Sequence, residues 1–222
     1  MQYKAVIFDL DGTLVNSLAD IADSVNAMLE GYGFPTHEIE KYRHFVGNGS
    51  QKLMERTLPE DKAASAEFVK DALAKYKEIY DVHLLEKTRP YTGINELLSA
   101  LKKYRIPVAI CTNKHMEAAT KIVNILFEKN LFQEVLGDRP GHPKKPDPAT
   151  PLEIAKNLGV QPEEVAYFGD SSVDMQTAVR AGFLPVGVLW GFRDKEELIA
   201  NGAKVLLEKP QELLEKVSFS KV

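Results

Sequence analysis

The sequence predicts a doubly wound, Rossmann-like α/β fold, with a parallel sheet core and an inserted all-helical cap subdomain. Three observations predict it. The apolar run at residues 5–8 ends in polar residues and a glycine, as a buried parallel strand does. From residue 89 onward, strand and helix patterns alternate, which implies a parallel sheet with right-handed crossovers. Between these two parts, residues 17–88 show only helical periodicity.

The core elements follow the first strand in a regular alternation. Helical patterns cover residues 94–104, 116–127, 151–158, 173–181 and the region near 194–201. Strand patterns cover residues 107–111, 165–168 and 184–189, with short apolar pieces at 132–136 and 203–207. We therefore assign residues 1–16 and 89–222 to the α/β core.

The inserted segment, residues 17–88, predicts a cap of helices. We expect helices at residues 18–29, around 39–45, at 51–58 and at 61–83, and no strand between residue 16 and about residue 87. An excursion of this length is a subdomain rather than a loop. It leaves and rejoins the core beside the first strand, so it should lie over the carboxyl end of that strand.

Composition narrows the class of protein. The chain has 222 residues, of which 44% are hydrophobic and 27% charged, as in a globular enzyme. A formal net charge of −4 argues against nucleic acid as the main partner. Cys111 is the only cysteine, so an intrachain disulfide and thiol metal sites are excluded. With neither a signal peptide pattern nor a membrane span, we expect a cytoplasmic protein, monomeric or homodimeric.

Two carboxylates, Asp9 and Asp11, follow the first strand directly. Ligands of open α/β sheets bind outside the carboxyl ends of the strands, so these acids stand where chemistry is usually done. Carboxylates this close repel each other unless a cation lies between them or one holds a proton. The alternative is an ordinary turn, since Asp and Gly favour turns.

Three further polar segments stand at the ends of later strands. They contain Thr112 and Asn113, then Lys145 in a Pro-rich loop, and finally Asp170 and Asp174 after Gly169. Taken singly, the threonine could cap a helix, the lysine could lie in a solvated loop, and the two acids could favour a helix N-terminus. In a parallel sheet, however, all these strand ends face one edge, so the groups should converge.

The converging groups suit phosphoryl transfer, in which a protein contributes mainly positioning and electrostatic stabilisation. Mg²⁺ prefers oxygen ligands, which Asp9, Asp170 and the main-chain carbonyl of Asp11 could supply. Lys145 would neutralise phosphoryl oxygens. Asp9 is then the candidate nucleophile, forming an aspartyl-phosphate. Asp11 is the candidate acid and base, protonating the leaving group and later activating water.

Together these motifs resemble those of the haloacid dehalogenase superfamily: Asp9-x-Asp11-Gly12-Thr13, Thr112-Asn113, Lys145-Pro146 and Gly169-Asp170-x-x-x-Asp174. The resemblance implies the roles given above for Asp9 and Asp11. It further implies that Thr112 and Lys145 bind phosphate, that Asp170 binds Mg²⁺, and that Asp174 orients the water shell of the metal. It also leads us to expect substrate contacts from Gly12, Thr13 and Asn113. The dehalogenase branch lacks an acid at the position of Asp11, so the resemblance implies a phosphatase.

Within the superfamily, local strings resemble those of phosphoglycolate phosphatases: Val46-Gly47-Asn48-Gly49, Arg89-Pro90-Tyr91-Thr92-Gly93, Thr112-Asn113-Lys114 and the segment 144–149. The function implied is Mg²⁺-dependent hydrolysis of a small phosphorylated metabolite, 2-phosphoglycolate in the first place. We expect Gly47, Asn48 and Gly49 to bind substrate, because glycines permit close backbone approach and a helix begins at residue 50. An ordinary helix start is the alternative for this loop.

Other functions stay open at this stage. A phosphomutase of the β-phosphoglucomutase type, a sugar phosphatase and a pyrophosphatase share the fold and motifs. A phospho-acceptor signalling domain also uses acids, a Thr and a Lys, but has no cap and no acid placed like Asp11. A non-enzymatic scaffold would have no reason to keep every catalytic group.

Overall fold

Strand β1 (Ala5–Phe8) lies inside a parallel sheet, as the sequence predicts. The computed structural model describes residues 2–220, and within them the large sheet has six strands in the order β5-β4-β1-β6-β7-β8, all parallel. Its other strands are β4 (Val108–His115), β5 (Glu134–Asp138), β6 (Val165–Gly169), β7 (Leu184–Val188) and β8 (Val205–Leu207). The predicted fold class is therefore confirmed.

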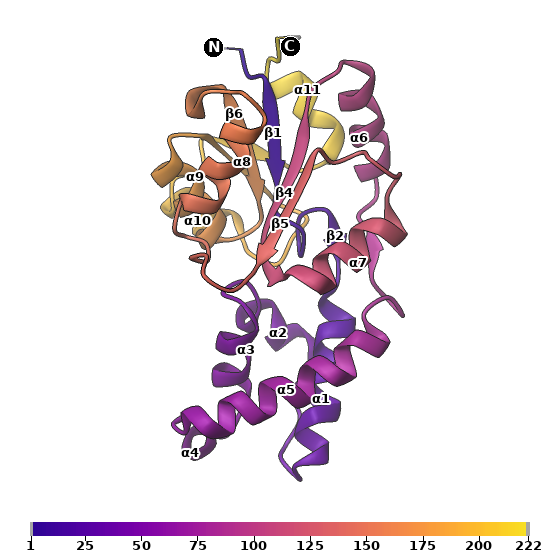
Figure 1. The fold of residues 1–222 in the computed structure, drawn as a ribbon, viewed down its shortest axis with the longest axis vertical. Helices are drawn as coiled ribbons and strands as arrows, with labels where there is room; N and C mark the ends of the chain where they lie inside the picture. The colour runs from indigo at the N-terminus through magenta and orange to yellow at the C-terminus, as the bar shows by residue number, and fades with distance from the viewer. Residues whose placement is uncertain (1, 221–222) are drawn as a thin grey trace.

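Helices cover both faces of this sheet, with α8 and α9 on one side and α6 and α7 on the other (Figure 1). Alternate residues of β1 serve the two faces: Ala5 and Ile7 belong to the apolar cluster under α8 and α9, whereas Val6 and Phe8 belong to the larger cluster under α6 and α7. This alternation follows from the strand period of two. The core helices are α6 (Ile94–Lys103), α7 (Met116–Leu126), α8 (Ala149–Asn157), α9 (Ser172–Ala181), α10 (Lys195–Ala200) and α11 (Leu213–Lys216), with 3₁₀ turns at Pro162–Glu164 and Pro210–Glu212.

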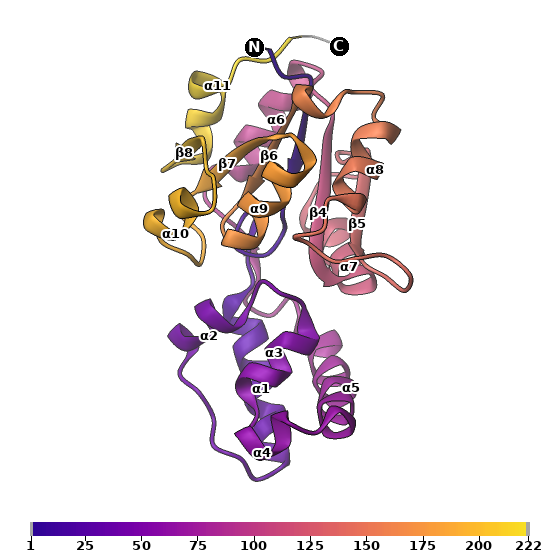
Figure 2. The same cartoon turned by 90° about the vertical axis from the view of Figure 1, so that its left-hand side faces the viewer.

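The cap is a separate helical lobe beyond the carboxyl ends of the strands, as the two views at right angles show (Figures 1 and 2). It consists of α1 (Leu18–Gly31), α2 (Ile39–Phe45), α3 (Ser50–Thr57), α4 (Glu60–Ala63) and α5 (Ala66–His83). The helix expected over residues 61–83 is in fact two helices. Ser65 separates them, and its side chain accepts a hydrogen bond from the Phe68 N–H as the N-cap of α5.

Two short strands connect the cap to the core, β2 (Val15–Asn16) and β3 (Arg89–Pro90), paired antiparallel. The hydrophobic pattern did not predict them, because two residues are too few to show a period. The return segment is also held by Asp20, whose buried carboxylate accepts hydrogen bonds from the main-chain N–H groups of Lys87 and Thr88. The two segments that connect core and cap are thus held side by side by hydrogen bonds.

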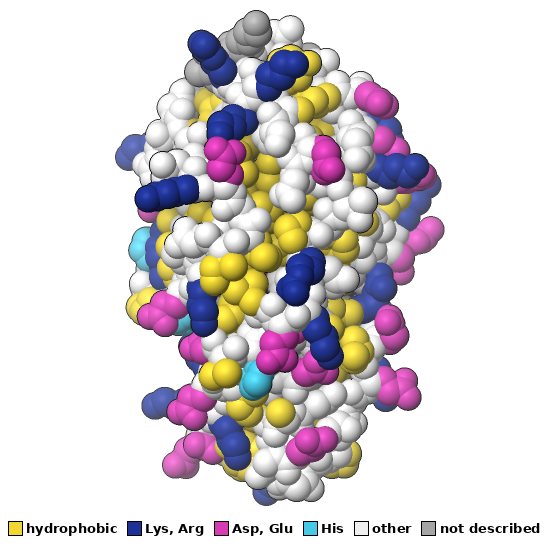
Figure 3. Space-filling view, turned by 90° about the vertical axis from the view of Figure 1, so that its right-hand side faces the viewer, with side chains coloured by type: hydrophobic (Ala, Val, Ile, Leu, Met, Phe, Trp, Pro, Cys, Tyr) yellow, Lys and Arg dark blue, Asp and Glu magenta, His cyan; other side chains and the backbone are white. Residues whose placement is uncertain are grey.

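On the face shown in Figure 3, basic and acidic side chains are intermixed around apolar patches, so neither sign of charge dominates. Within residues 2–220, no helix combines the length and the hydropathy needed to cross a bilayer. Cys111 is buried in β4, where burial raises the pKa of its thiol to about 12.

Candidate active site

Asp9 follows β1 directly, and the turn after it is packed against a second acid, Asp170. Asp9 is 8% exposed and Asp170 is 2% exposed. Gly12 has φ +82°, and a Cβ there would lie 2.2 Å from Asp170 Oδ2. A Cβ on Gly191 would also lie 2.2 Å from the Asp170 Cβ. Both positions require glycine because the backbone must approach the acid this closely.

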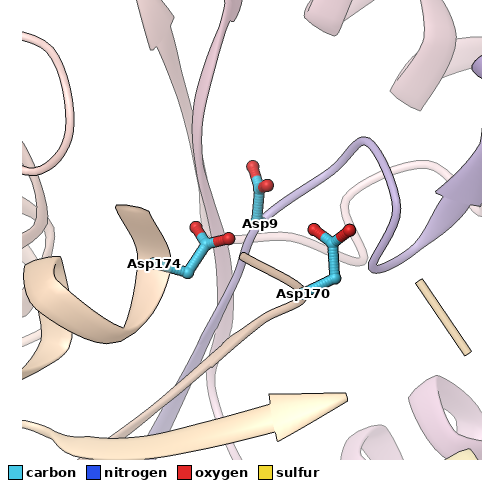
Figure 4. Close-up of side chains that lie close together, drawn as sticks. All are labelled: Asp9, Asp170 and Asp174. Atoms are coloured by element: carbon cyan, nitrogen blue, oxygen red, sulfur yellow. The ribbon is translucent and has the colours of Figure 1, made fainter. Parts of the chain in front are cut away.

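Three carboxylates converge at this edge of the sheet: Asp9, Asp170 from the loop after β6, and Asp174 from α9 (Figure 4). Each offers an oxygen within 4.8 Å of the others. The oxygens of Asp174 are already engaged, because Oδ2 accepts hydrogen bonds from the N–H (3.1 Å) and hydroxyl (2.6 Å) of Ser171 at the start of α9. The structure thus brings together the acids that the sequence motifs separate by more than half the chain.

Lys145 is the cation of this cluster. Its Nζ donates to Asp174 Oδ1 at 2.7 Å and forms an ion pair with Asp9 Oδ1 at 2.8 Å. Asn113 fixes the lysine backbone, since its Oδ1 accepts from the Lys145 N–H (2.9 Å) and its Nδ2 donates to the Lys145 carbonyl (3.0 Å). The side chain of Lys145 is 3% exposed, so its position is set by the protein rather than by water.

Electrostatics at the cluster reflect an excess of negative charge. Burial raises the pKa of Asp9 from its ordinary 3.8 to about 7, against the opposing attraction of Lys145 and with a further upward push from Asp174. Burial, followed by the charges of Asp174 and Asp9, raises the pKa of Asp170 well above its ordinary value. Burial alone would lower the pKa of Lys145, but Asp174 and Asp9 raise it, so this lysine stays charged. One ammonium does not neutralise three buried carboxylates.

A divalent cation fits this donor set. Asp9 Oδ1 is buried, and among the residues described its close partner is Lys145 Nζ at 2.8 Å. Hard carboxylate oxygens are the ligands that Mg²⁺ prefers, and the raised pKa values of Asp9 and Asp170 show that added positive charge would be stabilising. Asp9 and Asp170 are the residues that would hold it.

Asp11 stands apart from this acid cluster. Its carboxylate accepts a hydrogen bond from the Ser17 hydroxyl, and Lys114 Nζ lies 3.1 Å from both of its oxygens. Lys114 also donates to the Tyr80 hydroxyl of cap helix α5 at 2.7 Å. The carboxylate of Asp11, the predicted acid and base, is therefore held by Ser17 and Lys114. It is not part of the cluster formed by Asp9, Asp170 and Asp174.

A cavity lies between core and cap above these residues. The core supplies Asp9, Asp11, Thr112, Asn113 and Asp170 to its lining, and the cap supplies Gly47, Gly49, Ser50, Tyr76 and Tyr80 among others. Hydrogen bonds cross its rim: Asn113 Nδ2 donates to the Gly47 carbonyl (3.1 Å), and Arg193 Nη2 donates to the Val46 carbonyl (2.8 Å). In this structure residues of the cap and residues of the core thus line the same cavity as the acids.

The segment after β7 connects the cap to the acid cluster. Arg43 of α2 donates to the carbonyls of Gly191 (2.8 Å) and Phe192 (3.2 Å). The Phe192 N–H in turn donates to Asp170 Oδ2 at 2.7 Å, and Trp190 Nε1 donates to the Thr13 carbonyl at 2.9 Å. One short segment therefore contacts the first motif, the acid of the last motif and the cap.

The expected substrate-binding residues are placed unequally. Asn113, Gly47 and Gly49 line the cavity, whereas Gly12 and Thr13 are buried and are not among its lining residues. The Asn48 side chain accepts a hydrogen bond from Arg56 Nη2 (2.8 Å) on α3 instead of lining the cavity.

Thr112 lies inside β4 and does not cap the following helix; its hydroxyl accepts from the Lys114 N–H. Strand β4 itself continues to His115, beyond the predicted end at residue 111.

Sequence reasoning gave no role to several residues of this site, namely Ser17, Arg43, Tyr80, Lys114, Gly191, Phe192 and Arg193. Lys114 directly follows the Thr112-Asn113 motif, and this position was the signal that could have identified it as a site residue. Ser17 stands six residues after Asp11, whereas most of the others contact residues far away in the chain.

Comparisons with known proteins agree with this geometry. A family model described as haloacid dehalogenase-like hydrolase matches residues 6–188. A phosphoglycolate phosphatase of Chromobacterium violaceum is 33% identical over 200 residues, which cover 89% of this chain and 90% of that protein. A phosphoglycolate phosphatase of Neisseria meningitidis is 36% identical, covering 86% of this chain and 82% of that protein. The crystal structure of a protein from Haemophilus somnus described as a predicted phosphoglycolate phosphatase matches with a TM-score of 0.89 and 28% identity, covering 97% of this chain and 98% of that one.

Proposed function

The chain belongs to the haloacid dehalogenase-like hydrolases, and from this premise we propose that it hydrolyses 2-phosphoglycolate in a Mg²⁺-dependent reaction through an aspartyl-phosphate on Asp9. The coarser statement, that it is a phosphoric monoester hydrolase, rests on the family and its relatives together. The observation that supports the mechanism most directly is the pairing of Asp9 with Lys145 at the end of β1.

In the proposed first step, Asp9 attacks phosphorus. An anionic carboxylate approaches an anionic phosphate only if positive charge surrounds both. Lys145 supplies part of that charge at 2.8 Å from Asp9 Oδ1, and bound Mg²⁺ would supply the rest by neutralising phosphoryl oxygens. Asp174 and Asn113 keep Lys145 in place through its Nζ and its backbone.

Asp11 would handle the protons. Asp11 lies outside the acid cluster, and as a carboxylic acid it would give a proton to the leaving oxygen. As a carboxylate it would then take a proton from the attacking water in the second step. Water must be excluded while Asp9 attacks and admitted afterwards. The cap contacts made by Asn113 and Arg193 suit a lid that closes over the cavity and opens again.

The glycine loop of the cap remains part of the proposal. Gly47 and Gly49 line the cavity, and Arg56 braces the intervening Asn48, so the loop is held in one shape above the site. The cytoplasmic location, the absence of nucleic acid and membrane partners, and a monomeric or homodimeric state are proposed on the sequence alone.

The test is phosphate release by the purified protein from a panel that contains 2-phosphoglycolate, sugar phosphates and pyrophosphate. We expect 2-phosphoglycolate to give the highest kcat/KM. Activity should require Mg²⁺, disappear with excess chelator, and return only weakly with Ca²⁺, which prefers more ligands and looser geometry.

Acid quenching during turnover should trap phosphate on the peptide that contains Asp9. Isomerisation of a sugar phosphate without phosphate release would establish a mutase instead. Full activity in chelator would contradict the metal assignment.

A further inference from the structure

Lys114 is a buried cation of the cavity to which the proposed reaction gives no task. It follows the Thr112-Asn113 motif on β4, and its side chain is 6% exposed. Its Nζ contacts both oxygens of Asp11 at 3.1 Å and the Tyr80 hydroxyl oxygen at 2.7 Å. The ammonium therefore lies where core and cap meet, beside the predicted acid and base.

Two other largely buried cations near the acids are committed elsewhere. Lys145 contacts Asp9 and Asp174. Arg193 donates to the Val46 carbonyl and pairs with Glu197 at 3.4 Å. Lys77 of α5 also lines the cavity, but it is only half-buried, and among the described residues the cation paired with Asp11 is Lys114.

The shape of the proposed substrate places its second anionic group next to this lysine. In 2-phosphoglycolate one methylene separates the leaving oxygen from the carboxylate carbon, so two bonds of about 1.5 Å span the distance. If Asp11 protonates the leaving oxygen, that oxygen lies within hydrogen-bond reach of Asp11. The carboxylate must then lie within a few ångströms of Asp11, which is where Lys114 Nζ is found.

We propose that Lys114 binds the carboxylate of the leaving group and so selects anionic over neutral phosphate esters, a role that rests on the proposed function above. An ammonium has three donors, so Lys114 can exchange one Asp11 oxygen for a substrate oxygen. Asp11 stays hydrogen-bonded during the exchange because Ser17 donates to its Oδ1.

Tyr80 adds a second donor for the same group. Its oxygen accepts from Lys114, and its own hydrogen makes no hydrogen bond within the described part of the chain. Burial, together with the charge of Asp11, raises the pKa of Tyr80 well above its ordinary value, so the hydroxyl keeps its proton. Because Tyr80 lies on α5, this contact would form only with the cap closed.

A role confined to positioning Asp11 would predict something different. Loss of a mere counter-ion should slow every substrate alike, because every phosphomonoester needs Asp11. Loss of a carboxylate-binding group should slow anionic leaving groups selectively. The charge of the leaving group therefore separates the two roles.

The experiment compares 2-phosphoglycolate with its neutral amide, 2-phosphoglycolamide, in wild type, Lys114→Met and Lys114→Arg. A charge-assisted hydrogen bond lost on one substrate only should lower the kcat/KM ratio, acid over amide, by about 10- to 100-fold in Lys114→Met. Lys114→Arg should recover part of that ratio, since it keeps the charge.

The matched control is Lys121→Met. Lys121 also joins core to cap, donating to the Asp81 carbonyl at 2.7 Å, but it is exposed and does not line the cavity. It should leave the ratio unchanged. An equal loss on both substrates in Lys114→Met would overturn the proposal, as would a wild-type enzyme that does not prefer the acid.

Inhibition separates this inference from the proposed function. With any phosphomonoester that wild type hydrolyses as reporter, 3-phosphonopropionate should inhibit at lower concentration than propylphosphonate, and Lys114→Met should remove that difference. If 2-phosphoglycolate is not a substrate but the difference holds, the proposed substrate fails and the carboxylate site stands. If the difference is absent in wild type, the carboxylate site fails.

Discussion

Core and cap use their polar side chains in different ways. In the core, charged side chains form ion pairs with one another: Lys145 lies between Asp9 and Asp174, and all three residues are buried. At the boundary with the cap, most hydrogen bonds end on main-chain carbonyls, as those from Arg43 and Arg193 do. Lys114 and Tyr80 form a side-chain pair across this boundary.

From this difference we expect the core to stay fixed and the cap to move. Loss of Lys145 would strongly destabilise the charge network of the core, because its carboxylates would be left buried without their cation. Hydrogen bonds to carbonyls at the rim contribute about 1 kcal/mol each and can be replaced by water when the cap opens. Changes in the core should therefore remove the chemistry, and changes in the cap should alter affinity.

Asp9→Asn should have the largest effect. An amide cannot attack phosphorus, and loss of an essential nucleophile removes about three or more orders of magnitude in kcat. Steady-state kinetics measure the loss, and circular dichroism should show an intact fold because the two side chains have the same shape. Activity above about a thousandth of wild type would show that Asp9 is not the nucleophile.

Asp11→Asn should reduce turnover by roughly 10²–10⁴, the usual contribution of a general acid or base. The loss should be greater for an alkyl phosphate than for p-nitrophenyl phosphate, whose leaving group needs no proton. Binding of Mg²⁺, measured by calorimetry, should change little because the Asp11 carboxylate stands outside the acid cluster. Equal losses on the two esters would argue against acid catalysis.

Arg43→Ala should act from the cap side, with a smaller effect. The variant loses hydrogen bonds to the carbonyls of Gly191 and Phe192, and a charged donor of this kind contributes enough for about a tenfold rise in KM. Stopped-flow or steady-state kinetics with 2-phosphoglycolate provide the measurement. Lys102→Ala, which removes an exposed ion pair with Glu128 on the core, serves as the control. A loss confined to kcat would mean that Arg43 does not act through cap closure.

The smallest effect expected is on stability, in metal-free protein. Asp9 has a pKa of about 7 in the folded chain against an ordinary 3.8, so between these values the folded state binds the extra proton. Stability should then fall as pH rises from about 4 to about 7 and level off above. Asp9→Asn removes this penalty, so its Tm should exceed that of wild type by at least about 2 °C at pH 8, a gain that shrinks towards pH 5.

Thermal melts in chelator at pH 5, 6, 7 and 8 measure this difference. Added Mg²⁺ should reverse its sign at pH 8, because the cation stabilises the ionised acids of wild type. A Tm difference that does not depend on pH would contradict the raised pKa of Asp9.

Much of the core was predictable because its signals are local. Residues 5–8 form a continuous apolar run, so the acids that follow it are expected at the carboxyl end of a strand. Ligand sites of open α/β sheets lie at such ends. The same rule joined Asp9 to Asp170, which lie far apart in sequence. Strand β4 was predicted too short because its last residues, including Thr112 and Lys114, are polar and break the apolar pattern.

The boundary between core and cap was not predictable in the same way. Arg43 bonds to carbonyls at positions 191 and 192, and no periodicity relates residues so distant. The paired strands β2 and β3 have two residues each, below the length at which alternation can be recognised. The break at Ser65 did carry a signal, since serine is a preferred N-cap, but the helical pattern on both sides concealed it.

Phe192 links ligand binding in the core to docking of the cap. Its N–H donates to Asp170 and its carbonyl accepts from Arg43, so one peptide segment is shared by an acid of the cluster and a helix of the cap. Whatever factor a docked cap adds to ligand affinity at Asp170, a ligand there adds the same factor to docking of the cap. Loss of the ligand from the cluster would therefore weaken docking of the cap by that same factor, so the cap would open more readily once the reaction has consumed the substrate.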